Sequence, residues 1–269
     1  MELSVFDSLK AATPRPLLAA AGSAMMKWRG DNRRFGVDRD GHWLNIQPEA
    51  TFVSPDIYTP FYAQVEGSVI DYWCTFDRPQ SGDTIIDVGA GIGEDALVFS
   101  KLVGPSGRVI AIEAHPNTFA CLKGTIERSG LTNVVAVQCA IADREGTLTM
   151  SDDSEHLANS MLKTGGGVEV PAKTLDALLV ELGIDQVDLL KMNIEGAERP
   201  AMAGMTGSAP RIRTVAISCH DLVADAGGGD EFRTRDFVRP ALEAMGYVVR
   251  QRSEAAHPWL RDTLFGTRG

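Results

Sequence analysis

From residue 82 onward, short apolar runs alternate with segments whose apolar residues recur at helical spacing. The apolar runs predict strands near 84–88, 108–113, 134–139, 187–193, 213–219, 246–251 and 262–267. The intervening segments predict helices near 94–102, 116–129, 174–182, 197–203 and 232–245. This alternation is typical of an α/β fold in which helices cover both faces of a doubly wound, mostly parallel sheet. The last two strands fit an antiparallel hairpin at its edge.

Residues 1–80 precede this pattern and are predicted to form an N-terminal extension, whereas residues 81–269 form the main domain. The extension is predicted to contain a helix near 17–28, a hairpin of 33–37 and 42–46, and an aromatic helix near 58–76. Aromatic residues at helical spacing indicate packing against a core. The alternative is a lid over a ligand, with Tyr58 or Glu66 in contact with that ligand.

A glycine-rich turn joins the first strand of the main domain to its first helix. Gly89, Gly91 and Gly93 follow one another at spacing two, and glycine lets the backbone turn sharply and leaves room for a ligand. The dinucleotide-binding fingerprint has its third glycine one residue later. Asp87 ends the strand, and a carboxylate there suits the ammonium group of a ligand better than a phosphate. The turn therefore predicts a binding site for an amine.

Glu113 ends the second strand of the main domain, 20 residues beyond Gly93. An acidic residue at this place can accept hydrogen bonds from both hydroxyls of a ribose. A site with an ammonium near Asp87, a ribose near Glu113 and no phosphate clamp fits S-adenosylmethionine. It fits a nicotinamide dinucleotide less well.

Five segments in the right order carry a resemblance to a known family. They are DVGAGIGE at 87–94, EAHPNTF at 113–119, AIADREGTL at 140–148, KTLDALL at 173–179 and DLLKMNIEGAE at 188–198. The sequence resembles the class I S-adenosylmethionine-dependent methyltransferases, and the last two segments narrow the resemblance to the FkbM family. The resemblance implies a Rossmann-like sheet of seven mostly parallel strands, S-adenosylmethionine as cofactor, and an adenine lined by the backbone around Ala140.

Polar residues at the ends of the fourth and fifth long strands are candidates for the chemistry. The FkbM pattern usually has an aspartate where this chain has Asn193, which is implied to bind the methionine end of the cofactor or the acceptor hydroxyl. Glu195 is expected nearest the sulfonium, and His220 and Asp221 end the next strand. Either His220 removes the hydroxyl proton as a general base, or Glu195, His220 and Asp221 hold Mg²⁺ that acidifies the hydroxyl. We therefore predict His220, Glu195 and Asn193 as catalytic, and Glu198 as an acid at a helix start.

The composition limits the partners of the protein. A formal net charge of −10 and a pI near 5.0 argue against nucleic acid and against an anionic membrane surface. No apolar run approaches the length of a membrane-spanning helix. The four cysteines show no CxxC pairing and lie in apolar contexts, which indicates reduced thiols and a cytoplasmic location.

The acceptor has to be inferred from the loops. The glycine-rich segments 151–170 and 221–231 are expected to be loops that border the acceptor pocket. We predict an O-methyltransferase whose small-molecule or oligosaccharide acceptor offers a hydroxyl of a sugar, a glycan or a natural product. An NAD-dependent oxidoreductase and a non-catalytic cofactor-binding scaffold are the alternatives. The N-terminal hairpin and exposed aromatic residues indicate a possible homodimer contact.

Overall fold

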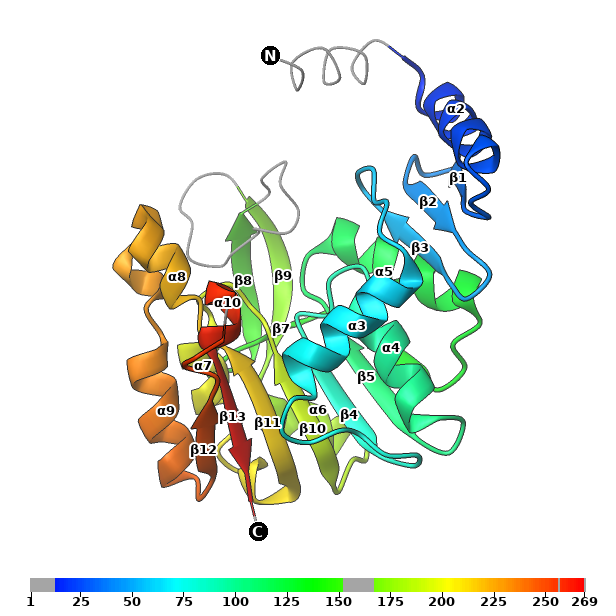
Figure 1. Ribbon diagram of the computed structural model, residues 1–269. Helices are drawn as coiled ribbons and strands as arrows, with labels where there is room; N and C mark the ends of the chain where they lie inside the picture. Colours follow the sequence, from blue (N-terminus) through cyan, green and yellow to red (C-terminus); the bar gives the residue numbers. More distant parts are fainter. Residues whose placement is uncertain (1–12, 152–166, 256, 269) are drawn as a thin grey trace.

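The computed structural model describes residues 13–151, 167–255 and 257–268 and shows an open seven-stranded sheet (Figure 1). The strands lie in the order β12–β13–β11–β10–β4–β5–β6. β13 pairs antiparallel with both β12 and β11, and the strands from β11 to β6 pair parallel. Their bounds are β4 (Thr84–Val88), β5 (Arg108–Ile112), β6 (Val134–Val137), β10 (Val187–Met192), β11 (Ile212–Ser218), β12 (Val248–Gln251) and β13 (Thr263–Thr267). The seven predicted strands and the antiparallel edge are confirmed.

Helices cover both faces of this sheet. One face carries α3 (Tyr62–Trp73), α4 (Glu94–Val103) and α5 (Pro116–Ser129), and the other carries α6 (Leu175–Glu181), α7 (Glu198–Ala203) and α9 (Arg235–Ala244). Successive strand residues point to opposite faces, so a sheet covered on both sides needs apolar residues in both directions. In β4, Ile85 packs in the cluster under α3 and α4, while Ile86 packs in the cluster under α6 and α7. The five predicted helices are confirmed.

A second sheet follows β6 and lies beside the carboxyl end of β5. It consists of β7 (Ala140–Ile141), β8 (Gly146–Ser151) and β9 (Gly167–Lys173), in the order β7–β9–β8. Ala140, Met150 and Val170 form its own small apolar cluster, against which Ala114 packs. The prediction of a loop over 151–170 is therefore wrong for Ser151, which ends β8, and for residues 167–170, which are paired in β9. Residues 152–166 lie outside the described part of the chain.

The N-terminal extension contains the predicted helix and hairpin and one additional strand. α2 (Arg15–Trp28) packs beside an antiparallel sheet of β1 (Arg34–Val37), β2 (Trp43–Ile46) and β3 (Thr51–Ser54). The strand β3 is absent from the prediction because the prolines on either side of it indicate a loop. Tyr62 and Trp73 of α3 are buried with α4 in the core of the main domain, which confirms the packing interpretation of the aromatic helix.

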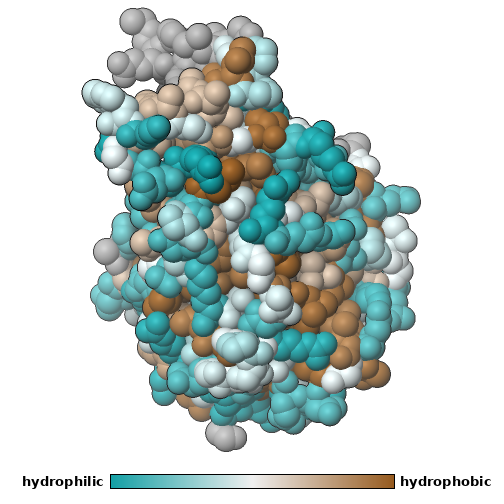
Figure 2. All heavy atoms as spheres, turned by 90° about the vertical axis from the view of Figure 1, so that its right-hand side faces the viewer, coloured by the Kyte–Doolittle hydropathy of each residue, from teal (hydrophilic) through white to brown (hydrophobic). Residues whose placement is uncertain are grey.

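The prediction of a loop over 221–231 is wrong for most of its length. The short helix α8 (Asp221–Val223) is followed by a π-helical turn, η3 (Ala224–Gly228), and by a 3-10 turn, η4 (Asp230–Phe232). A further short helix, α10 (Pro258–Arg261), precedes β13. No helix in the described ranges is both long and apolar enough to span a membrane. Figure 2 shows hydrophobic atoms on the N-terminal extension, where the α2 residues Leu17, Met25 and Trp28 are exposed, Trp28 to 85%. The homodimer contact stays a prediction.

Candidate functional site

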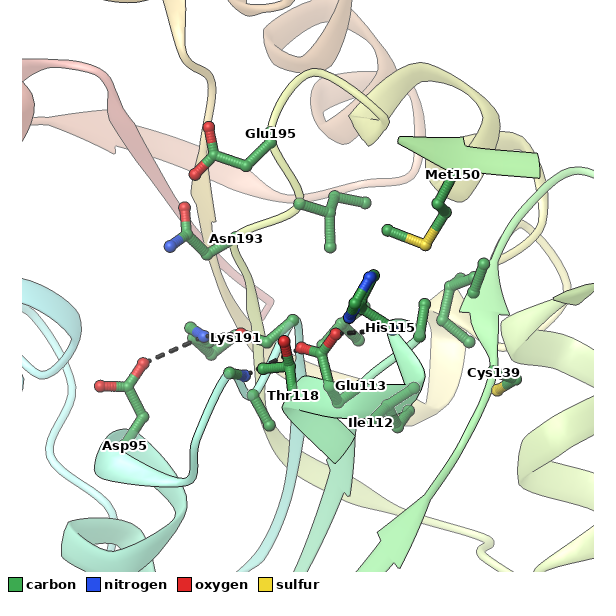
Figure 3. A pocket seen from close by; sticks show the side chains of 18 of the residues that line it. Asp95, Ile112, Glu113, His115, Thr118, Cys139, Met150, Lys191, Asn193 and Glu195 are labelled. Carbon is green, nitrogen blue, oxygen red and sulfur yellow. Dashed lines mark hydrogen bonds and ion pairs between the residues drawn. The ribbon is translucent and has the colours of Figure 1, made fainter. Parts of the chain in front are cut away.

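A cavity opens at the carboxyl ends of β4, β5 and β10, which are neighbours in the sheet (Figure 3). Its walls come from the glycine turn after β4, the start of α5, β7 and β8, and the segment after β10. Glu113, His115 and Thr118 contribute polar side chains from one side, and Lys191, Asn193 and Glu195 contribute them from the other. The motifs that lie far apart in the sequence therefore meet at one edge of the sheet.

Glu113 lies on the floor of this cavity and is held in a fixed orientation. Its two carboxylate oxygens accept hydrogen bonds from the backbone N–H groups of Gly91, at 3.0 Å, and His115, at 2.8 Å. Burial raises the pKa of Glu113 to about 7, against the opposing effect of these two donors. The carboxylate keeps lone pairs for a ligand in the cavity. This geometry suits the ribose contact that the sequence predicts.

The three glycines of the turn have different roles. Gly89 and Gly91 line the cavity with positive φ values of 74° and 56°. A Cβ on Gly89 would lie 2.0 Å from the carbonyl oxygen of Asn193, whereas a Cβ on Gly91 would meet no atom within 4 Å. Gly91 therefore leaves open space on the cavity side. Gly93 does not line the cavity; it precedes α4 and packs against Leu122 of α5.

Asp87 does not line the cavity, which corrects the predicted direct contact with a ligand. Its fully buried carboxylate lies 2.8 Å from Nζ of Lys191, its register partner on β10. The same Nζ lies 3.0 Å from Asp95 and donates a hydrogen bond of 2.9 Å to the carbonyl oxygen of Gly89. Burial disfavours the charged ammonium, but Asp87 and Asp95 outweigh it and raise the pKa of Lys191. An ammonium group of the chain itself thus occupies the place beside Asp87.

Asn193 and Ala140, which are predicted to contact the cofactor, both line the cavity, and Thr118 and His115 are further members of its wall. The Oγ1 atom of Thr118 is buried and has no hydrogen-bond partner within the described ranges. An unsatisfied buried hydroxyl is unusual and suits a ligand contact. Both additional residues lie in the EAHPNTF segment, in which Glu113 follows the strand and α5 begins. The segment that indicates Glu113 therefore also indicates these two residues.

Glu195, His220 and Glu198 form a row of side chains beside the cavity. Nε2 of His220 lies 3.4 Å from Oε1 of Glu195, and its Nδ1 lies 2.9 Å from Oε1 of Glu198. Burial lowers the pKa of His220, but the two carboxylates outweigh it and raise the pKa to about 10. Glu195 lines the cavity, whereas His220 lies behind it and does not. The imidazole is thus a charged partner of two carboxylates at neutral pH.

The three predicted ligands of Mg²⁺ do not converge. The Asp221 carboxylate accepts a hydrogen bond of 3.0 Å from the backbone N–H of Arg235 and lies 3.3 Å from its guanidinium group. Both ring nitrogens of His220 face carboxylates, and a protonated imidazole has no lone pair for a metal. Within the described residues, no group of three or more His, Cys, Asp or Glu side chains is arranged to hold a metal ion. The metal prediction is therefore not supported by this geometry.

A second, apolar cavity of about 740 Å³ lies in the N-terminal extension, between α2 and the segment before α3. Tyr58 lines this second cavity, and its hydroxyl donates a hydrogen bond to Glu94, which lines the first. Glu66 contacts neither cavity and accepts a hydrogen bond from Tyr62 instead. Of the two residues proposed for a lid, only Tyr58 therefore reaches the wall of the main cavity.

A comparison with protein-family models decides the family. The model described as "Methyltransferase FkbM domain" matches residues 87–249, which is more than half of the chain. The chain belongs to the FkbM methyltransferase family. This result confirms the resemblance carried by the sequence segments and removes the oxidoreductase alternative. The cavity described above lies where the members of this fold class bind their ligand, beyond the carboxyl ends of the strands.

The individual proteins that match this chain are only distantly similar to it. The 31-O-demethyl-FK506 methyltransferase FkbM of Streptomyces tacrolimicus is 28% identical over 52% of this chain and 66% of its own length, slightly below two thirds. The methyltransferase sdnD of Sordaria araneosa is 25% identical over 63% of this chain and 74% of its own. A crystal structure of methyltransferase FkbM from Methylobacillus flagellatus KT has a TM-score of 0.50 at 16% identity, and covers 72% of this chain and 45% of that one. This last likeness confirms the fold alone.

Proposed function

We propose that this protein transfers the methyl group of S-adenosylmethionine to a hydroxyl oxygen of a small natural product or sugar. The observation that carries the proposal is the shared cavity, in which Glu113 at the end of β5 faces Asn193 and Glu195 after β10. The name of the Streptomyces relative places the methyl group on an oxygen, which supports a hydroxyl acceptor.

The residues of the cavity fit the cofactor. Glu113 offers carboxylate oxygens to the ribose hydroxyls. The hydroxyl of Thr118, which has no partner among the described residues, offers one further hydrogen bond. The open side of Gly91 leaves room for a close approach of the ligand to the backbone. Ala140 and Ile141 line the part of the cavity beside the second sheet, where we place the adenine.

The direct partner of the cofactor's own ammonium cannot be Asp87, because Lys191 already neutralises that side chain. Asp95 and Glu94 remain on the cavity wall at the start of α4. We assign the ammonium to Asp95, which is 19% exposed and pairs with Lys191 on one side only. Asp87 then acts indirectly, because it holds Lys191 against the carbonyl oxygen of Gly89.

S-adenosylmethionine supplies a methyl group on a sulfonium, with the leaving group already in place. Glu195 takes the proton of the acceptor hydroxyl while the oxygen–carbon bond forms and the carbon–sulfur bond breaks. His220 is not assigned this step, because an imidazolium with carboxylates on both nitrogens has no free lone pair. Asn193 orients the acceptor from the same wall. Holding the reacting atoms in line lowers the barrier by about 7–11 kcal/mol.

Calorimetric titration tests the first half of this proposal. Purified protein is expected to bind S-adenosylmethionine and S-adenosylhomocysteine, and a flat titration with both would refute the assignment. Transfer of a radiolabelled methyl group to a panel of methyl glycosides and macrocyclic alcohols tests the second half. Glu195→Gln and His220→Ala are expected to keep cofactor binding and to lose turnover, and unchanged turnover would remove the altered residue from the mechanism.

A further inference from the structure

Glu198 is a fully buried carboxylate at the start of α7. Its Oε1 atom accepts a hydrogen bond of 3.3 Å from the N–H of Gly196 and lies 2.9 Å from Nδ1 of His220. Its Oε2 atom is buried and has no hydrogen-bond partner in the described part of the chain. Burying a carboxylate is unfavourable unless the carboxylate is well paired, so a role limited to helix stabilisation does not account for the position of Glu198. The single ionic partner of Glu198 in the described ranges is His220.

The imidazole of His220 links this buried carboxylate to the cavity wall. Glu198 belongs to α7, His220 follows β11, and Glu195 belongs to the segment after β10. The three side chains therefore connect three separate elements in one row, in which both ring nitrogens face a carboxylate oxygen. A histidine oriented by a buried acid on one nitrogen and acting on a second group through the other is the logic of a catalytic triad.

The backbone at this row is strained. Glu195 has φ 51° and His220 has φ 55°, and no other non-glycine residue of the described ranges has a positive φ. A left-handed conformation is unfavourable at such a residue and persists only where the surroundings impose it. Here the strain falls on the two residues that face each other. The fold thus holds both of them in unfavourable conformations that bring the carboxylate and the ring together.

We propose that Glu198 is a positioning residue for methyl transfer, which through the ring of His220 fixes the carboxylate of Glu195 at the cavity wall. This inference rests on the proposed function, in which Glu195 receives the proton of the acceptor hydroxyl. Glu198 itself touches neither the cavity nor any reacting atom. The other charged groups around the ring are Asp221 beside it, Asp262 before β13, and Arg235 of α9, which pairs with both of these acids.

Two-dimensional NMR of ¹⁵N-histidine tests the inference without an acceptor. The His220 ring signal is assigned as the one that disappears in His220→Gln. At about neutral pH this signal is expected to be that of an imidazolium in the wild-type protein and that of a neutral ring in Glu198→Gln. Glu198→Asp keeps the charge and is expected to retain the imidazolium signal. Glu243→Gln, an exposed change on α9, is the matched control. An unchanged His220 signal in Glu198→Gln would overturn the proposal.

Measurements of cofactor binding and of turnover distinguish a failure of this inference from a failure of the proposed function. Glu198→Gln is expected to bind S-adenosylhomocysteine within about twofold of the wild type, while kcat with the best acceptor of the panel falls about a hundredfold and Glu198→Asp recovers part of it. Equal losses of binding and of kcat in Glu198→Gln would indicate a structural role and refute the inference. Failure of the wild type to bind the cofactor would refute the proposed function instead. The ring signals would still show whether Glu198 keeps His220 charged.

Discussion

Replacement of Lys191 by methionine tests how the glycine turn is held. The Lys191 ammonium is the cation between Asp87 and Asp95, and its side chain and that of Asp87 are 1% and 0% exposed. Methionine keeps the length and the apolar contacts of the side chain but removes the charge. Removing one partner of a buried ion pair leaves an uncompensated charge and costs about 3–5 kcal/mol. We therefore expect Lys191→Met to lose about this much of the free energy of unfolding near pH 8.

The loss is expected to depend on pH in a defined direction. Burial raises the pKa of Asp87 and Lys191 opposes this rise, so the folded-state pKa of Asp87 increases further in Lys191→Met. The unfolded pKa stays at about 3.9. Between the two values the folded state holds a proton that the unfolded state releases, so each unit of increasing pH costs up to about 1.4 kcal/mol of stability. The raised pKa of Lys191 does not make the free energy of unfolding of the wild type vary with pH in this range, because its contribution to stability is fully present below about pH 10.

Urea unfolding at about pH 5 and about pH 8 measures both effects. Lys123→Met, an exposed change on α5, is the matched control and is expected to lie within about 0.5 kcal/mol of the wild type. The double variant Lys191→Met with Asp87→Asn removes both charges and is expected to recover part of the loss and to abolish the pH slope. A loss below about 1 kcal/mol at the higher pH, or an equal loss at both, would refute the reasoning.

The remaining predictions concern the cavity wall. Glu113→Gln is expected to weaken S-adenosylhomocysteine binding about tenfold to a hundredfold by calorimetry, and wild-type binding is expected to weaken as the pH falls through about 7, because protonation removes the better acceptor. Thr118→Val removes a hydroxyl without a described partner, so we expect an unchanged melting temperature and about twofold to tenfold weaker binding. Tyr58→Phe leaves Glu94 without its described donor and is expected to cost about 1–3 kcal/mol in urea unfolding. Binding as tight as in the wild type in Glu113→Gln or Thr118→Val, or an unchanged free energy of unfolding in Tyr58→Phe, would contradict the assignment of that residue.

The elements that could be predicted are those with strong local signals. β4 and β5 are continuous apolar runs because both faces of the sheet are buried, and a run of this kind has few other interpretations. Glycines or prolines at helix ends mark the limits of α4 and α5 equally well. The site residues that follow such strands, Glu113 and Asn193, were therefore placed at the correct edge. β3 and β9 lack this signal, because nearby prolines and glycines indicate loops.

The partners of the charged side chains could not be predicted in the same way. Asp87 and Lys191 are separated by more than one hundred residues and meet only because β4 and β10 are neighbours in this register. The sequence pattern predicts that Asp87 lies near the end of a strand but does not show which strand lies beside it. The same limit explains the metal prediction, because the capture of Asp221 by Arg235 depends on how α9 packs. Contacts across elements need the register and the packing, which a local pattern does not contain.

The charges of the cavity wall suit a ligand that carries two cationic groups. Lys191 balances one of the two acids that it contacts, and His220 balances one of the two carboxylates that it faces. Glu94, Asp95, Glu113 and Glu195 are the acids on the described wall of the cavity. Burial raises the pKa of Glu94 and Glu113, and a cationic ligand opposes this rise. A surplus of carboxylates in a partly buried site attracts a sulfonium and an ammonium more than their neutral analogues. After transfer the sulfonium charge is gone, so the same surplus that favours binding of the cofactor no longer holds the product as strongly.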